Sequence, residues 1–510
     1  MQIPAEGTSD PRPRSFHLPL PTWLTGPKVT WSVLALLLVL VWGPRLFRSL
    51  WVDETCTFWL AHQGVVAAVE KTWHWPPQSI LYSVIETPFC FHGGPFRDFM
   101  LRVPTLIGML AAGYFVYRLA EDAIGRGSGF VAAALFAFHP QAIRLGSQAR
   151  PYGLAVAAVA GSCWMLYRWV ETRERRSLVG YVVASTLIVY LHYFFATVFL
   201  VHAAYVLFVF AMERRSGRWR EFVAALVAIG LLALPLVPHM LMLLHEAHEY
   251  VFMPAPSVAE LADQLLPSIF AVGPLAAAFL VQLAFPGALK PPVALRQSFL
   301  FLLLVWWLFG TLLFFAFSRA TPMHVFVARY IAFSFPGQAL LLAYAGYCVF
   351  GRIEGRVWAV LAVLLSTASP LSMLAAHETA EEELLPFVRI IRSESAQGAP
   401  PVLFRSEFQE SNSLDWRGGT PETSRLYAPF VAYPIRNPLV LLPNHLTDDV
   451  KAYISSTIDS TLASLPEVIF VTHDNTGVDW MIERMGRAGF QAHTKKPNSF
   501  TVVIFKRPAG

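Results

Sequence analysis

Long apolar runs separated by short polar segments occupy the first three quarters of the chain. A helix needs about 20 mainly apolar residues to cross a bilayer, and counting runs near that length predicts about eleven spans. The two runs on either side of His192 are short, and if they form one broken element the orientation of every later span reverses. The approximate limits are 29–44, 100–119, 127–143, 152–170, 178–191, 193–211, 221–243, 267–285, 298–317, 330–350 and 357–374.

After about residue 376 the pattern changes, and polar helical stretches alternate with short apolar runs. This alternation predicts a small α/β domain over 376–510 with a partly parallel sheet. Thr447 is typical of a helix start and Gly489 of a helix stop. The expected helices are 381–395, 448–464 and 478–488, and the expected strands are 402–404, 439–442, 468–471 and 500–505.

Composition supports a membrane protein, because 55% of the residues are hydrophobic and only 14% are charged. The mean hydropathy of +0.49 excludes an ordinary soluble domain of this size. The formal net charge of +5 comes from short Lys and Arg clusters between apolar runs. That pattern is topological, so we expect no nucleic-acid partner.

The distribution of positive charge predicts the orientation in the membrane. Residues 1–28 are rich in proline and predict a disordered cytosolic tail, followed by an uncleaved signal anchor. With the N-terminus inside, an odd number of spans places the C-terminal domain outside. The inner loops then contain Arg173, Arg175, Arg176, Arg214, Arg215, Arg218, Arg220, Lys290, Arg296, Arg352 and Arg356.

Three outer segments contain the candidate chemistry. The first is the long loop 45–99, whose pieces 58–69 and 80–85 are amphipathic enough to lie along the membrane interface. The second is the turn 146–152, and the third is 328–330 before a late span. Their notable residues are Asp53, Glu54, His74, Pro76, Pro77, Gln148, Arg150, Tyr152, Arg329 and Tyr330.

Two carboxylates directly after a span are costly near hydrocarbon, which indicates a task for Asp53 and Glu54, although a solvated loop start remains an alternative. Arg150 and Arg329 lie on the side where arginine is disfavoured, and a guanidinium suits a phosphate at the bilayer surface. Each arginine could instead be an interfacial anchor. The neighbouring Tyr152 and Tyr330 are candidates for the same phosphate site, with a place in the aromatic belt as their default interpretation.

Other polar positions give weaker signals. His245 and His248 are three residues apart rather than the four of a zinc protease motif, so they either contact a metal or substrate or end a span. Cys56 and Cys90 share the first outer loop and could form a disulfide. Cys163 and Cys348 read as small apolar residues inside spans; they are core candidates rather than functional ones.

The motifs together resemble the GT-C glycosyltransferases, most closely the bacterial protein O-mannosyltransferase-like and lipid A aminoarabinose transferase-like branch. The resemblance covers roughly residues 29–350 of a membrane catalytic domain predicted over 29–375. It rests on Trp-Val-Asp-Glu at 51–54, Pro-Pro at 76–77 followed by Tyr82, Ser-Gln-Ala-Arg-Pro-Tyr-Gly at 147–153, and Ala-Arg-Tyr at 328–330.

This resemblance implies transfer of a sugar from a polyprenyl-phosphate carrier to an envelope acceptor at the outer face of the bacterial cytoplasmic membrane. It implies Asp53 as catalytic base, and Arg150 and Arg329 on the donor phosphate. Glu54 is the rival for the base, because adjacent side chains diverge in direction and only one can face the acceptor. Those relatives carry Glu-Lys before Pro-Pro where this chain has His74-Trp75, which puts their metal site in doubt. Because the phosphate already activates the donor, a divalent metal is optional; its candidate ligands are His74, His245 and His248.

A lipid or glycan transporter is the alternative, since transporters also combine many spans with ionisable residues. A transporter predicts charges near the middle of the membrane. In this sequence the notable charges cluster at the outer ends of the predicted spans, which favours the enzyme.

Overall fold

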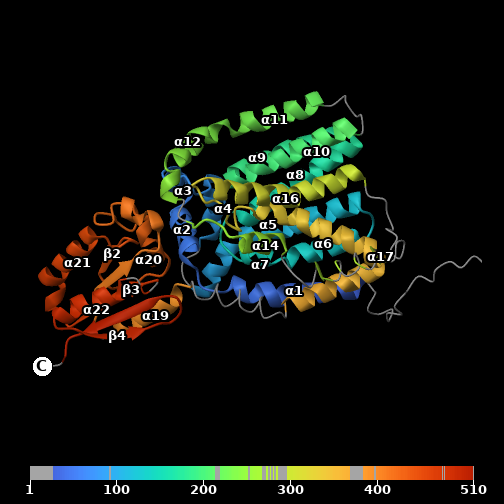
Figure 1. Ribbon diagram of the computed structural model, residues 1–510. Coiled ribbons are helices and arrows are strands. Elements are labelled where there is room, and N and C mark those ends of the chain that lie inside the picture. Colours follow the sequence, from blue (N-terminus) through green and yellow to red (C-terminus); the bar gives the residue numbers. More distant parts are fainter. Residues whose placement is uncertain are drawn as a thin grey trace, which may run out of the picture.

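The computed structural model describes residues 27–90, 94–212, 219–250, 253–266, 296–367, 383–395, 398–473, 475 and 477–508, with a few isolated residues between 272 and 284. Figure 1 shows long helices side by side in one bundle, with a smaller domain, coloured orange to red, against one end of it. A helical bundle with a C-terminal domain built on a sheet is the architecture that the sequence predicts.

The bundle forms where the apolar runs lie. Five of its described helices are long and apolar enough to cross a membrane: Phe96–Ala123, Tyr152–Thr172, Tyr193–Met212, Trp219–His245 and Gln297–Ala320. The total of about eleven spans therefore stays a prediction. The helices are α1 (Pro27–Leu46), α5 (Gly94–Ala123), α6 (Ser128–Ala137), α7 (Pro140–Gly146), α8 (Tyr152–Thr172), α9 (Arg175–Leu191), α10 (Val198–Met212), α11 (Trp219–Ala233), α12 (Val237–His245), α13 (Ala247–Tyr250), α14 (Val258–Leu265), α16 (Gln297–Ala320) and α17 (Phe335–Thr367).

Some predicted span limits differ from the helices. The predicted span 127–143 is divided into α6 and α7, because Pro140 begins α7 and disfavours helical backbone at His139. The predicted spans 330–350 and 357–374 both fall on α17, which is one continuous helix that packs partly along α1. The predicted span 267–285 and most of the tail 1–28 lie outside the described residues.

The runs flanking His192 form separate helices. The backbone of His192 is extended, with φ −161° and ψ 109°, and this ends α9. A 3-10 turn, η2 (Tyr193–Thr197), then leads into α10. The chain does not continue as one helix through this position.

The segment that the sequence predicts to be the first outer loop folds into short helices that cover the end of the bundle. They are α2 (Val52–Ala61), α3 (Val65–Trp73) and α4 (Ile80–Glu86), followed by the turn η1 (Thr87–Phe89). The expected single amphipathic piece 58–69 is interrupted at Gly64, whose φ of +95° suits glycine and separates α2 from α3. Asp53 and Glu54 lie in the first turn of α2, where the positive end of the helix dipole stabilises carboxylates.

Helices α5 and α8 approach each other unusually closely. A Cβ added to Gly108 would lie 2.4 Å from the backbone carbon of Gly153, so only glycine fits. Next to this contact the Thr105 hydroxyl donates to the carbonyl oxygen of Arg150 at 2.6 Å. The close approach therefore fixes the turn that carries Arg150.

The C-terminal domain contains a five-stranded mixed sheet in the order β2-β1-β3-β5-β4. Strand β1 is parallel to β2 and β3, whereas β5 is antiparallel to β3 and β4. The edge strand β4 is absent from the predicted strands, because its sequence is polar and fully exposed. The elements are α19 (Leu385–Glu394), β1 (Val402–Arg405), α20 (Ala428–Ala432), β2 (Leu439–Leu442), α21 (Asp448–Ser460), β3 (Glu467–Thr472), α22 (Val478–Arg487), β4 (Gln491–Lys495) and β5 (Thr501–Lys506).

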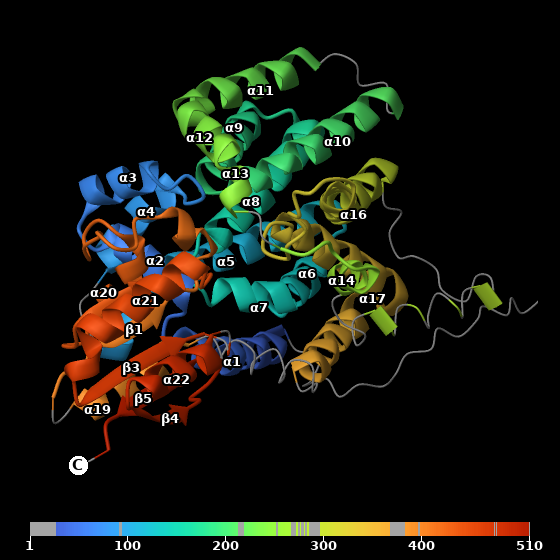
Figure 2. The same ribbon diagram turned by 60° about the vertical axis from the view of Figure 1, so that its left-hand side comes forward.

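The domain and the first outer loop share one hydrophobic core, which includes Phe58 of α2 and Phe430 of α20. The Tyr433 hydroxyl donates to the Asp98 carboxylate at 2.8 Å and accepts from the Leu50 amide at 2.7 Å. The seam between the C-terminal domain and the first outer loop is visible in Figure 2, where α20 lies beside α2. Residues of the C-terminal domain are thus held next to the helix that carries Asp53.

Candidate active site

The carboxylate of Asp53 faces two guanidinium groups from distant parts of the chain. Its Oδ2 atom lies 3.9 Å from Arg150 Nη2 and 3.6 Å from Arg329 Nη1. The Asp53 side chain is 26% exposed, so it stays accessible to a reactant. The structure therefore brings together the three charged residues singled out in three separate outer segments.

Arg150 contacts Gln78 as well as Asp53. Its Nη1 atom donates to Gln78 Oε1 at 3.1 Å and to the carbonyl oxygen of Asp53 at 3.4 Å. Burial lowers the pKa of Arg150, but Asp53 and Tyr152 more than offset this, and the pKa is raised. Gln78 is a site residue that the sequence analysis missed, although it directly follows the Pro76-Pro77 pair.

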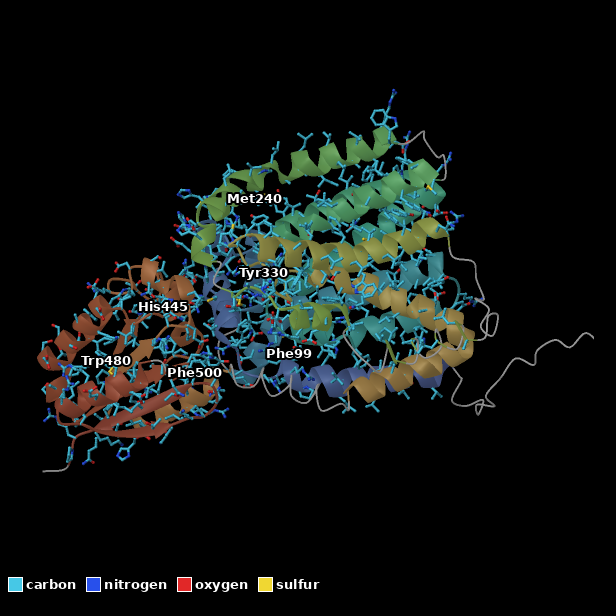
Figure 3. All side chains as sticks on the ribbon, viewed as in Figure 1. Phe99, Met240, Tyr330, His445, Trp480 and Phe500 are labelled. Carbon is cyan, nitrogen blue, oxygen red and sulfur yellow. The ribbon has the colours of Figure 1, made fainter. Side chains whose placement is uncertain are left out.

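The two arginines keep unused donors beside aromatic rings. Arg150 lies 6.0 Å from the ring centroid of Tyr152, and Arg329 lies 5.5 Å from that of Tyr330. Within the part of the chain that the structure describes, the buried Nε atoms of both arginines have no hydrogen-bond partner. Tyr330 lies near the end of the bundle that faces the C-terminal domain (Figure 3). Two charged donors at one site suit the oxygens of a phosphate.

His192 also belongs to this site, although in the sequence it marked only a boundary between two predicted spans. Its ring centroid lies 5.3 Å from that of Tyr152 and 5.8 Å from that of Tyr330. Burial, together with the charges of Arg150 and Arg329, lowers the pKa of His192 to about 3. The imidazole is neutral near pH 7 and adds no charge to the site.

Glu54 is in a position unlike that of Asp53, because it is fully buried and saturated with hydrogen bonds. It accepts from Arg102 Nε and Nη2 at 2.7 and 2.6 Å, from the Ala149 amide at 2.7 Å, and from the Trp51 amide at 3.3 Å. No lone pair faces an incoming reactant, so the expectation that Glu54 could be the base does not fit its surroundings. It instead braces α2 against the turn that carries Arg150.

The remaining candidate residues are not part of the group formed by Asp53, Arg150 and Arg329. His74 is exposed and its Nδ1 atom lies 2.9 Å from the Glu70 carbonyl oxygen, at the end of α3. Gln148 contributes its carbonyl oxygen, which accepts from the Arg150 amide at 2.8 Å. His245 and His248 are both exposed. Across the described ranges, no three His, Cys, Asp or Glu side chains are grouped to hold a metal ion.

The disulfide considered for the first outer loop does not form, because Cys56 and Cys90 are both free thiols. Burial is the main cause that raises the pKa of each thiol. Both cysteines are therefore protonated near pH 7 and act as small packing residues.

Comparisons with known proteins define the class of fold. A model of the dolichyl-phosphate-mannose-protein mannosyltransferase family matches residues 93–242. The crystal structure of ArnT from Cupriavidus metallidurans bound to undecaprenyl phosphate is similar, with a TM-score of 0.51 and 13% identity, over 94% of this chain and 98% of that one. The same protein in the apo state gives a TM-score of 0.50 and 12% identity, with the same coverage.

A second similar structure is that of the apo oligosaccharyltransferase of Archaeoglobus fulgidus, with a TM-score of 0.51 and 12% identity over 92% of this chain and 73% of that one. No curated protein matches the sequence. The chain has the fold of the GT-C membrane glycosyltransferases, and the resemblance predicted from its motifs is confirmed.

Proposed function

We propose that this chain is a membrane glycosyltransferase that moves a sugar from a polyprenyl-phosphate donor to an envelope acceptor at the outer face of the bacterial cytoplasmic membrane. The observation that carries the proposal is the accessible Asp53 carboxylate between Arg150 and Arg329. The fold supports it, because a structure with this fold was solved with undecaprenyl phosphate bound.

The chemistry follows from the charges at the site. Asp53 takes the proton of an acceptor hydroxyl, whose oxygen attacks the anomeric carbon of the donor sugar. The bond between that carbon and the phosphate oxygen breaks, and the phosphate leaves on its lipid carrier. Arg150 and Arg329 offset the negative charge that develops on the departing phosphate.

A lipid or glycan transporter would place its binding charges along a path through the bundle. Here Asp53, Arg150 and Arg329 converge in loops and first turns at one end of the helices. That arrangement favours chemistry at a membrane surface over passage through the bundle.

The function is tested with purified protein, vesicles of total envelope lipid, and a panel of radiolabelled polyprenyl-phosphate monosaccharides. We expect label to move from one of these donors to an envelope acceptor. Movement of intact donor between the leaflets, with no transfer of label, would support the transporter and contradict the enzyme.

Replacing Arg150 with Ala is expected to weaken binding of the polyprenyl phosphate. A hydrogen bond to a charged group contributes about 1.5–3 kcal/mol, so the dissociation constant should rise roughly ten- to a hundredfold. Binding of a labelled polyprenyl-phosphate monosaccharide to the purified variant measures this. Arg176→Ala, which removes an exposed guanidinium paired with Glu174, is the control. Equal affinity in the two variants would remove Arg150 from the donor site.

The proposed orientation is tested by cysteine labelling from the outer side of intact cells. A thiol at Ser413→Cys, which is exposed in the C-terminal domain, should react with an impermeant maleimide. A thiol at Arg175→Cys, at the exposed first residue of α9, should stay unlabelled until the membrane is permeabilised. The reverse pattern would place Asp53 on the cytosolic side and contradict an outer-face reaction.

A further inference from the structure

A second charged pair lies across the seam from Asp53, on the C-terminal domain. Glu410 belongs to the turn η7 (Gln409–Ser413), and Arg425 begins the turn η8 (Arg425–Tyr427). Arg425 Nε lies 3.3 Å from Glu410 Oε1, and the two side chains are 11% and 8% exposed. This pair is distinct from Asp53, Arg150 and Arg329.

The pair is attached to the loop that positions Arg150. The Arg425 guanidinium lies over the ring of Trp75, 4.4 Å from its centroid. Trp75 stands three residues before Gln78 and packs edge-on against Phe408 at 6.2 Å. The C-terminal domain thus contacts the segment whose Gln78 accepts a hydrogen bond from Arg150.

The pair also shares its electrostatic surroundings with Asp53. Cys56 lies one turn beyond Asp53 on α2, and after burial the carboxylates of Asp53 and Glu410 raise its pKa while Arg150 and Arg425 lower it. Burial raises the pKa of Glu410, Arg425 opposes this, and Asp53 and Glu249 contribute to the increase. Both charged groups therefore act on the same buried thiol.

A buried donor beside the pair has no hydrogen-bond partner. The indole Nε1 of Trp75 makes no hydrogen bond to any described residue and Trp75 is only 5% exposed, whereas Arg425 Nε faces Glu410 at 3.3 Å. Leaving the indole N–H unpaired costs free energy, so a ligand that accepts from it is favoured. An acceptor substrate lying between these groups and Asp53 would fill that need.

The chemistry of the pair suits neighbouring hydroxyl groups. A carboxylate only accepts hydrogen bonds and a guanidinium only donates them, whereas each hydroxyl does both. The surroundings are acidic, since Glu249 lies near Glu410, and Tyr250 beside Arg425 donates to Glu246 at 3.1 Å. This excess of carboxylates disfavours an acceptor that carries a phosphate in addition to the phosphate of the donor.

We propose that Glu410 and Arg425, stacked on Trp75, bind the acceptor beside Asp53, and that this acceptor is a neutral glycan end with neighbouring hydroxyls. The inference rests on the proposed function and adds to it the class of acceptor. Glu410 and Arg425 are positioning residues, because Asp53 alone takes the proton.

The test compares two acceptor probes in phosphatidylcholine vesicles. One is a glycolipid ending in an unmodified hexose, and the other is the same glycolipid phosphorylated on that hexose. Transfer to each probe and hydrolysis of the donor by water are measured together. We expect transfer to the neutral probe to exceed transfer to the phosphorylated probe. In Glu410→Gln and Arg425→Gln the KM for the neutral probe should rise about tenfold, as loss of a charged hydrogen bond predicts, and the ratio of transfer to hydrolysis should fall.

Two further variants separate positioning from folding. Trp75→Phe keeps the aromatic ring and removes only the indole N–H, so it tests the site if the charge variants are unstable. Arg484→Gln removes a guanidinium paired with Asp459 elsewhere in the same domain, and its KM should match that of the unchanged protein.

Preference for the phosphorylated probe, or an unchanged KM in folded Glu410 and Arg425 variants, would overturn the inference. Absence of both transfer and hydrolysis in the unchanged protein with every donor would instead count against the proposed function itself.

Discussion

Asp53→Asn should lower the turnover of sugar transfer at least about a hundredfold, as expected when a positioned general base is removed. Asparagine keeps the size of the side chain and leaves an amide oxygen that can face Arg150 and Arg329, which lie 3.9 and 3.6 Å from the carboxylate. Binding of the donor should change far less than turnover, because the amide loses proton affinity rather than shape. Single-turnover assays and donor-binding measurements on the purified variant separate the two effects.

Asp459→Asn is the matched control, because its carboxylate is 67% exposed and pairs with Arg484 in the C-terminal domain. This control should retain the turnover of the unchanged protein. A folded Asp53→Asn protein with full turnover would end the assignment of Asp53 as base.

Glu54→Gln should instead damage the fold, with a loss of about 3–5 kcal/mol in the free energy of unfolding, because it leaves a buried charge unpaired. The Glu54 and Arg102 side chains are 0% and 3% exposed, so water cannot replace the lost partner. Arg102 also donates to the carbonyl oxygens of Leu46 and Arg48, at 3.0 and 2.7 Å, where α1 ends. Thermal unfolding in detergent, followed by tryptophan fluorescence, measures the loss.

Glu483→Gln provides the comparison, since its pair with Arg487 is 64% and 70% exposed on the two sides. Exposed pairs contribute about 0–1 kcal/mol, so this variant should unfold close to the normal temperature. A Glu54→Gln protein as stable as the Glu483 variant would show that the Glu54–Arg102 pair does not brace the loop.

The sequence was informative about the site where position in the membrane limits the choice of residues. Asp53, Arg150 and Arg329 could be singled out because charges beside apolar runs are costly, and a shared outer face predicts that they meet. Gln78 and His192 gave no such signal, since neutral polar residues are tolerated in loops and at helix ends. Glu54 could not be told from Asp53, because adjacent carboxylates differ only in the direction each takes from α2.

The fold was predictable where periodicity is strong and less so where one residue redirects the chain. Apolar runs located the long helices, and alternation located four of the five strands. The separation of α2 from α3 depends on the backbone of Gly64, and the exposed edge strand β4 has no apolar face to reveal it. Contacts across the seam, such as Arg425 over Trp75, join residues 350 positions apart in the chain and need the tertiary structure.

Mass spectrometry of envelope glycans shows directly whether this chain transfers a sugar to the cell envelope through Asp53. Glycans are compared between cells with the gene, cells without it, and deleted cells carrying either the unchanged gene or Asp53→Asn. We expect one glycan to lose a single sugar on deletion, and only the unchanged gene to restore it. Identical glycans with and without the gene, or full restoration by Asp53→Asn, would contradict transfer through Asp53.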